Sequence, residues 1–197
     1  MKRSLFRLCG ALPVLLTGLP GMAGQNALEL TFSTTITPST CIATLHDSTG
    51  KANGIVDVGD VYIPQIVNKT NSRAFSLVFS DCVGLAKNMA TVTLRAKTGC
   101  DGASGGGNGF RNALTGSDDA ANVAAEVWTT STPGGSDSQQ LTCAKPVSLK
   151  VDQSPASEET TAILQLSTRI VLASGSTVAD LQTGTFSTQG VFTITYE

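Results

Sequence analysis

Apolar side chains recur at every second position in most of the apolar segments of this chain. A period of two is the pattern of a half-buried β-strand, because successive side chains point to opposite faces of the sheet. Turn residues separate the segments, and no 3.6-residue period extends over helical length, although residues 177–181 are compatible with one helical turn. The pattern predicts an all-β fold, an immunoglobulin-like antiparallel β-sandwich. The expected strands are 41–45, 55–58, 61–63, 73–79, 91–96, 123–128, 141–151, 160–172 and 184–196.

The first 23 residues have the features of a cleaved signal peptide. Three basic residues precede a short apolar stretch at 8–19, and small residues offer a cleavage site after Ala23 or Gly24. The apolar stretch is too short to span a bilayer. We therefore expect an exported, soluble mature protein.

Removal of this signal changes the charge balance. It carries three basic residues and no acidic ones, which leaves 10 basic against 15 acidic residues, about −5. The mature chain has neither a basic patch nor interleaved aromatic residues, so nucleic acid is not an expected partner. Roughly 173 residues remain, enough for one domain with a single core.

The mature chain begins with an alternating segment, residues 28–36. Its apolar face would consist of Leu28, Leu30, Phe32, Thr34 and Ile36. Such a strand must join a sheet, either in the same molecule or in another one. The alternation by itself favours the first strand of an ordinary closed sandwich.

Four cysteines remain after signal removal: Cys41, Cys82, Cys100 and Cys143. An even number in an exported chain predicts disulfides. Three pairings are possible, and we favour Cys41–Cys82 with Cys100–Cys143 because both join strand-like segments. Each would close a loop of about 40 residues, worth roughly 4 kcal/mol in the chain-entropy model. A metal site is the weaker alternative, since the chain has no C-x-x-C pair and one histidine.

No arrangement of residues predicts catalysis. His46 is the only histidine, so neither a Ser-His-Asp nor a Cys-His set can be assembled convincingly. The glycine-rich stretch 99–109 lacks the Lys-Ser/Thr of a phosphate-binding loop and is expected to be a flexible loop. The acidic pairs at 118–119 and 158–159 are adjacent residues in turn-like segments, so we expect them at the surface. We therefore expect neither an enzyme nor a cofactor.

Four features together resemble the pilin subunits of chaperone–usher fimbriae, the type 1 pilins in particular. The alternating arm 28–36 is followed shortly by Cys41, and a partner cysteine lies about 40 residues on, in the strand-like segment that ends with Asp81 and Cys82. The segment 56–59, Val-Asp-Val-Gly, is similar to the short strand that the family has between those cysteines.

The fourth feature is the C-terminal segment, in which Gly184 is fourteenth from the end and Tyr196 is penultimate. These are the two marked positions of the family. Each feature alone is weak, but the four in this order are specific, and they cover nearly the whole mature chain.

The resemblance implies a sandwich that lacks its final strand and is completed by a donor strand from another subunit. It assigns residues 24–40 to an N-terminal donor-strand extension and residues 41–197 to the pilin domain. It implies a groove edge formed by Gly184, Phe192, Ile194 and Tyr196. Neighbouring subunits and a periplasmic chaperone would bind at this edge. An outer-membrane usher would be a further partner. The implied location is a cell-surface fimbrium reached through the periplasm, which supports cell adhesion.

Two departures from the family pattern concern the arm and the second cysteine pair. Thr34 stands where the family often has a glycine that lets strand exchange begin, which bears on the rate of exchange. The pair Cys100 and Cys143 is additional to the usual single disulfide and favours a minor or specialised subunit. The alternative function is a single-domain secreted adhesin, a lectin-like module that binds host glycans through loops near Trp128 or 99–109.

Overall fold

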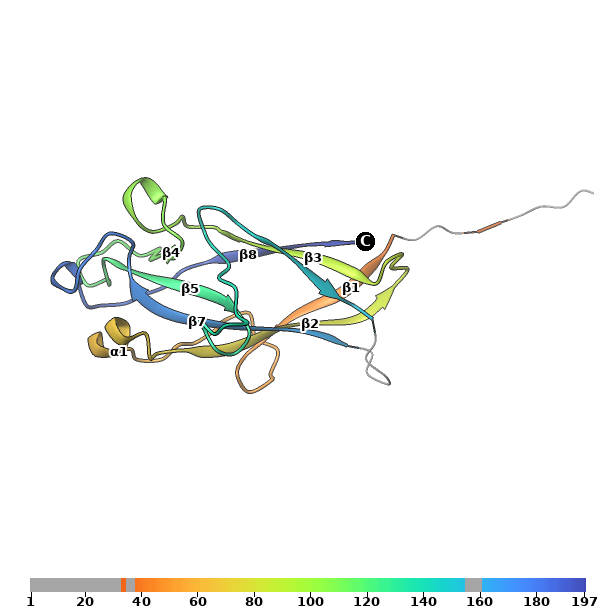
Figure 1. Cartoon of the computed structure of the whole chain (residues 1–197), viewed down its shortest axis with the longest axis horizontal. Helices are drawn as coiled ribbons and strands as arrows, with labels where there is room; N and C mark the ends of the chain where they lie inside the picture. Colours follow the sequence, from red (N-terminus) through yellow and green to blue (C-terminus); the bar gives the residue numbers. More distant parts are fainter. Residues whose placement is uncertain (1–32, 35–37, 155–160) are drawn as a thin grey trace, which may run out of the picture. The chain divides into compact units, whose positions relative to one another are not determined.

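The computed structural model describes residues 33–34, 38–154 and 161–197, and residues 37–197 belong to one compact unit. This unit is built from two antiparallel sheets (Figure 1). The first sheet has the order β1 (Thr40–His46), β2 (Arg73–Val83), β7 (Ala162–Leu172), β5 (Val123–Thr129) and β4 (Phe110–Arg111). The second has the order β6 (Ser148–Asp152), β3 (Met89–Ala96) and β8 (Gly190–Tyr196). Short helices are α1 (Ile63–Asn68), η1 (Ala103–Gly105) and η2 (Val178–Asp180).

The core lies between the inner faces of the two sheets. In β2 the residues Phe75, Leu77 and Phe79 are buried, and they alternate with less buried residues as the period of two requires. Phe75 and Leu77 are paired with Leu166 and Leu164 of β7. The opposite sheet contributes a second alternating row, Ala90, Val92 and Leu94 of β3.

The strand order of the described residues has the immunoglobulin pattern without the last strand, G. In that fold strands A, B, E and D form one sheet and C, F and G form the other. Here β1-β2-β7-β5 correspond to A-B-E-D, and β3-β8 correspond to C-F. The additional strand β6 pairs with the other edge of β3. Within residues 38–154 and 161–197, no strand takes the place of G beside β8.

Most expected strands are confirmed, and the differences have local reasons. The expected segments 73–79, 91–96, 123–128 and 160–172 contain or overlap β2, β3, β5 and β7, and the helical turn near 177–181 is η2. Of 141–151 and 184–196, only the ends form strands, as β6 and β8.

The expected strands at 55–58 and 61–63 are wrong. Residues 55–58 have no strand partner in the part of the chain that the structure describes. At Ile63 the helix α1 begins instead, with Pro64 in its first turn, where proline is well tolerated.

Two disulfides tie loops and strands together. Cys41–Cys82 joins the start of β1 to the end of β2, with a Cα–Cα distance of 4.1 Å. Cys100–Cys143 joins two loops, with a Cα–Cα distance of 5.5 Å. This pairing is the one favoured from the sequence, but the reason given for it, that both bridges join strands, holds for Cys41–Cys82 and not for Cys100–Cys143.

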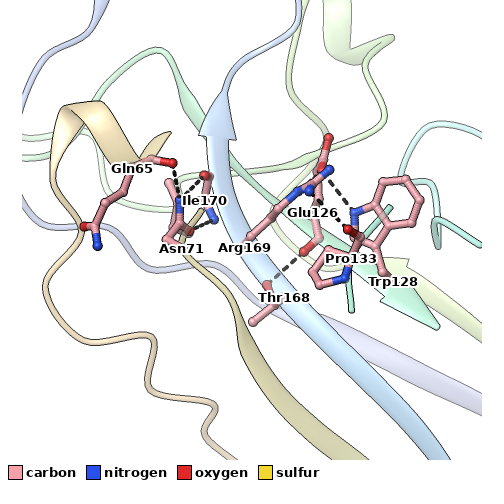
Figure 2. A network of polar contacts seen from close by, with 8 residues as sticks. All are labelled: Gln65, Asn71, Glu126, Trp128, Pro133, Thr168, Arg169 and Ile170. Atoms are coloured by element: carbon pink, nitrogen blue, oxygen red, sulfur yellow. Dashed lines mark hydrogen bonds and ion pairs between the residues drawn. The ribbon is translucent and has the colours of Figure 1, made fainter. Parts of the chain in front are cut away.

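On the face of β5 and β7 opposite the core lies a buried charged network (Figure 2). The Arg169 Nε donates to Glu126 Oε2 at 2.7 Å, and Nη1 donates to the Pro133 carbonyl at 3.4 Å. The Trp128 Nε1 donates to the same carboxylate oxygen at 3.0 Å, and the guanidinium lies 5.2 Å from the indole ring centroid. The loop that contains Pro133 thereby attaches to the sheet.

A second polar contact fixes α1 to β7 (Figure 2). The buried Asn71 amide donates to the Ile170 carbonyl at 2.9 Å and to the Gln65 carbonyl at 3.1 Å, while its oxygen accepts from the Ile170 amide at 2.6 Å. Asn71 therefore takes the place of a ladder partner for β7 and holds the helix against the sandwich. The side chain of Ile66 is buried beneath α1.

Candidate functional site: an open groove beside the C-terminal strand

The C-terminal strand β8 is the edge of its sheet. One side of β8 is paired with β3 from Ala90↔Tyr196 to Ala96↔Gly190. In the described part of the chain its other side has no strand neighbour. An edge strand presents unpaired backbone N–H and C=O groups, and these can pair with a further strand.

A groove of about 1350 Å³ begins beside the first residues of β8, Gly190 to Phe192, and opens into the core. Side chains from both sheets and from α1 line it, so its floor is the hydrophobic core itself. The apolar residues of this lining include Leu45, Ile66, Phe75, Leu94, Phe110, Val123, Val127, Ile170, Leu181, Phe186 and Phe192. Small-molecule pockets usually have about 300–1,000 Å³, so this groove has the size for a polypeptide segment.

Two chain segments form the rims of the groove. One rim is residues 54–63, and the other is residues 181–192. In the first rim, Val56, Val58 and Val61 pack against the core, although their segment joins no sheet among the described strands. A strand inserted between the rims would therefore have backbone on both sides of it and an apolar floor below.

The groove is bounded near the C-terminal end of β8. There the Tyr196 hydroxyl donates to the Cys41 carbonyl at 3.2 Å, which joins the second sheet to the start of β1. Burial raises the pKa of Tyr196, and the hydrogen bond to Cys41 lowers it by less, so the neutral phenol is favoured. From Leu45 and Phe192 the groove extends toward α1 and residues 181–189.

The structure brings part of the expected groove edge to this site. Phe192 lines the groove, whereas Ile194 and Tyr196 pack against the core beyond its bounded end. Their partners on β3 are Leu94, Val92 and Ala90. The assignment of these residues to chaperone or subunit contact stays a prediction.

Gly184 lines the groove and has a packing role of its own. Its φ of 152° is a conformation that side chains rarely adopt, and a Cβ there would collide with the Asp118 carbonyl oxygen and lie 2.7 Å from the Asp119 carbonyl carbon. The contact is close because Thr185 bonds the same segment: Thr185 N donates to Asp118 O at 3.2 Å, and Ala120 N donates to Thr185 O at 2.9 Å. Glycine at 184 therefore lets one groove rim approach residues 118–120.

Replacement of this glycine is expected to destabilise the fold. Gly184→Ala should lower the free energy of unfolding by about 1–3 kcal/mol or more, because overpacking adds to backbone strain. Urea unfolding of the variant measures this. The matched control is Gly175→Ala, where φ is 84° but nothing lies within 4 Å of the added Cβ. If both variants lose the same stability, close packing at Gly184 is not the cause.

The expected donor residues Leu28, Leu30, Phe32 and Ile36 lie outside the described residues, as does the expected signal peptide. Thr34 is described and exposed. The role of these five residues as a donor strand therefore stays a prediction.

Sequence reasoning missed the rim 54–63 as a part of the site. The signal was present, because Val56 and Val58 alternate like a strand that packs on the core. The alternation alone predicts an ordinary strand, whereas only the three-dimensional structure shows that this segment has no ladder partner among the described residues.

Neither a metal centre nor a membrane helix is found in the described ranges. No three His, Cys, Asp or Glu side chains are grouped there in a way that could hold a metal ion. None of the helices there is long and apolar enough to cross a membrane.

Trp128 is largely engaged inside the molecule. Its indole N–H donates to Glu126, and the Arg169 guanidinium lies over its ring. The N–H donor and one ring contact that a sugar ligand could use are therefore already occupied. The lectin-like alternative, through loops near Trp128 or 99–109, stays a prediction.

Comparison with known proteins shows that the chain is similar to a fimbrial-like protein. No family model matches the chain. The uncharacterized fimbrial-like protein YadL of Escherichia coli (strain K12) is 37% identical over 174 residues, which are 88% of this chain and 86% of the relative.

Two solved structures are more distant. The CupB6 tip adhesin of Pseudomonas aeruginosa is 19% identical with a TM-score of 0.45, covering 64% of this chain and 30% of that one. The P pilus rod subunit PapA is 14% identical with a TM-score of 0.44, covering 82% of this chain and 100% of that one. The argument for the family comes from YadL, whose identity and coverage are both high. The chain therefore belongs to the family of fimbrial-like proteins, in agreement with the resemblance to chaperone–usher pilins that its sequence motifs carry.

Proposed function

We propose that this chain is a structural, non-enzymatic subunit of a chaperone–usher fimbria that polymerises by donor-strand exchange. The observation that carries the proposal is the edge of β8 that has no strand neighbour among the described residues, beside an apolar groove. In the proposed fibre, residues 24–40 of each copy are the donor extension, and residues 41–197 form the pilin domain that accepts the extension of the next copy.

The chemistry of the proposed donor matches that of the groove. The arm 28–36 alternates between apolar and polar side chains, so one face would meet the apolar floor while its backbone pairs with β8. A nine-residue strand spans roughly 30 Å. Complete burial of Leu28, Leu30, Phe32 and Ile36 would contribute roughly 1.5–3 kcal/mol each, an upper range.

The same open edge gives a reason for a chaperone. An exposed edge over an apolar groove would pair with other copies out of order and aggregate. A periplasmic chaperone that lends a strand to this groove would prevent such pairing until an outer-membrane usher brings in the next subunit. These partners, and a cell-surface fimbrium as the final location, belong to the proposal.

The second disulfide supports a minor or specialised role within the fibre. Cys100–Cys143 joins two long loops outside the pattern of a single-disulfide pilin. Adhesion would then be supported through the assembled fibre.

Face-specific substitutions in the arm test the proposal. In the mature chain, Phe32→Asp should reduce assembly at least about tenfold, because the lost apolar burial alone exceeds 1.4 kcal/mol. Light scattering coupled to size-exclusion chromatography measures the assemblies. The matched control is Thr31→Asp, which places the same charge on the opposite face of the arm and should leave assembly close to that of the natural chain.

The outcomes are distinct. If both variants assemble like the natural chain, the arm is not the donor. If the natural mature chain is a stable monomer, its arm completes its own sandwich, and the proposal of exchange between copies fails.

A further inference from the structure

The proposed donor strand and the folded domain that carries it are joined by very few residues. Ile36 ends the arm, and the folded unit is described from Pro38 onward, with the Ser39 hydroxyl bonded to the Gly84 carbonyl. Two residue steps span at most about 7 Å. If the arm fills the groove of a neighbour, which is the proposed function on which this inference rests, the donor's domain must lie directly against the end of that groove.

The groove has one end at which such a neighbour fits. Near the C-terminus of β8 the Tyr196–Cys41 hydrogen bond joins the two sheets, and the chain's own β1 begins there. At the other end the groove extends to α1 and Leu181. Among the described residues, no hydrogen bond joins the two rims there. An arm that leaves at this open end runs antiparallel to β8, as every pair of strands in the two sheets does.

Exposed apolar side chains gather at the open end. Tyr62, Ile63 and Val67 are 67%, 37% and 46% exposed, and we call them the groove-end patch. Ile63 and Val67 are four residues apart on α1 and so share one helix face. Tyr62 and Ile63 also line the groove, so the patch is continuous with it.

The groove-end patch is held in place. Its helix is anchored through Asn71 to both Gln65 and Ile170 (Figure 2). Ile66 of the same helix is buried. The Tyr62 amide donates to Gln65 Oε1 at 2.9 Å, which fixes the start of the helix. A patch fixed in this way loses little conformational freedom on binding.

The domain of the donor presents a matching surface beside its arm. Val83 is the register partner of Thr40, and Ile42 lies two residues further along β1. Both side chains are 57% exposed, and we call them the root patch. These are the exposed apolar residues that the short connection brings closest to the groove of the neighbour.

We propose that the root patch of one copy packs against the groove-end patch of the next copy. This contact is separate from the inserted strand and fixes the angle between successive domains. The partner is a second copy of this chain, and the contact chemistry is apolar on both sides.

The test uses Val67 and Val83, because neither lines the groove. The mature chain, Val67→Ser, Val83→Ser and the double variant are assembled, and the dissociation rate of the assemblies in urea is measured. Each single variant should dissociate about fivefold faster, as expected for the loss of one apolar contact. Because the two side chains contact each other across the interface, the double variant should dissociate at a rate close to that of one single variant. Two independent effects would multiply to a clearly faster rate. Ile163→Ser, on a 49% exposed side chain of β7, is the matched control and should leave the rate unchanged.

A second readout separates this inference from the proposed function. Excess synthetic peptide of residues 24–37 should block assembly of every variant equally, because it competes for the groove alone. If the peptide blocks assembly but Val67→Ser and Val83→Ser dissociate at the natural rate, the patch contact is wrong and strand exchange stands. If the peptide has no effect on assembly, strand exchange fails and this inference fails with it.

Discussion

A domain of residues 38–197 is expected to unfold easily or aggregate, and to become a stable monomer when a copy of residues 27–37 is joined after Glu197. The added strand would pair with the open edge of β8 and cover the apolar floor of the groove. Burial of its four apolar side chains gives an upper gain of roughly 6–12 kcal/mol, from which the cost of ordering the strand is subtracted. The urea unfolding midpoint and the molar mass of both proteins measure the effect.

The linker gives this experiment a test of direction. A strand antiparallel to β8 begins beside Glu197, so a linker of about four residues suffices, as in a β-hairpin. A parallel strand would begin at the far end of the groove and would need a much longer linker. The control is an added strand with Leu28, Leu30 and Phe32 replaced by Ser. If the bare domain is monomeric and as stable as the complemented one, the sandwich is closed and the proposed mechanism fails.

Removal of one partner from the buried pair Arg169 and Glu126 is expected to cost about 3–5 kcal/mol of unfolding free energy. In Arg169→Met the Glu126 carboxylate keeps the Trp128 N–H but loses the cation, and the Pro133 carbonyl loses its donor. Few water molecules can compensate, because both side chains are nearly buried. Urea unfolding with both disulfides intact measures the loss.

The double variant Glu126→Leu with Arg169→Met shows whether the loss arises from the pair. Without either charge no buried ion is left uncompensated, so the double variant should be clearly more stable than Arg169→Met alone. If the losses of Arg169→Met and of Glu126→Leu, each measured alone, simply add in the double variant, the pair does not couple, and the network in Figure 2 contributes through its separate parts.

The central strands were predictable because each has one face in the core. Phe75, Leu77 and Phe79 alternate without interruption, and the period of two follows directly from the geometry of a strand. The helix α1 was not predictable in this way. Its six residues mix apolar and polar side chains over less than two helical turns, and so short a segment does not show a 3.6-residue period.

The burial of Glu126 and Arg169 could not be predicted from the sequence for a different reason. Glu126 and Arg169 occupy outward positions of β5 and β7, where a local pattern predicts contact with water. They are buried because the loop at Pro133 passes over them, and the path of a loop depends on contacts far apart in sequence. Likewise, the alternation in β8 predicted its inward face but could not show that its other edge has no strand neighbour in the described part of the chain.

In a fibre under tension, the disulfide between Cys41 and Cys82 would carry mechanical load. Pulling on the arm of one subunit would reach its domain at Thr40, the first residue of an edge strand, and would peel β1 from β2 one hydrogen bond at a time. The covalent bond one residue further on transfers the force directly to β2, which is paired on its other side with β7. Tension therefore passes into the centre of the sheet, and β1 is protected from unzipping at the point where the pull arrives.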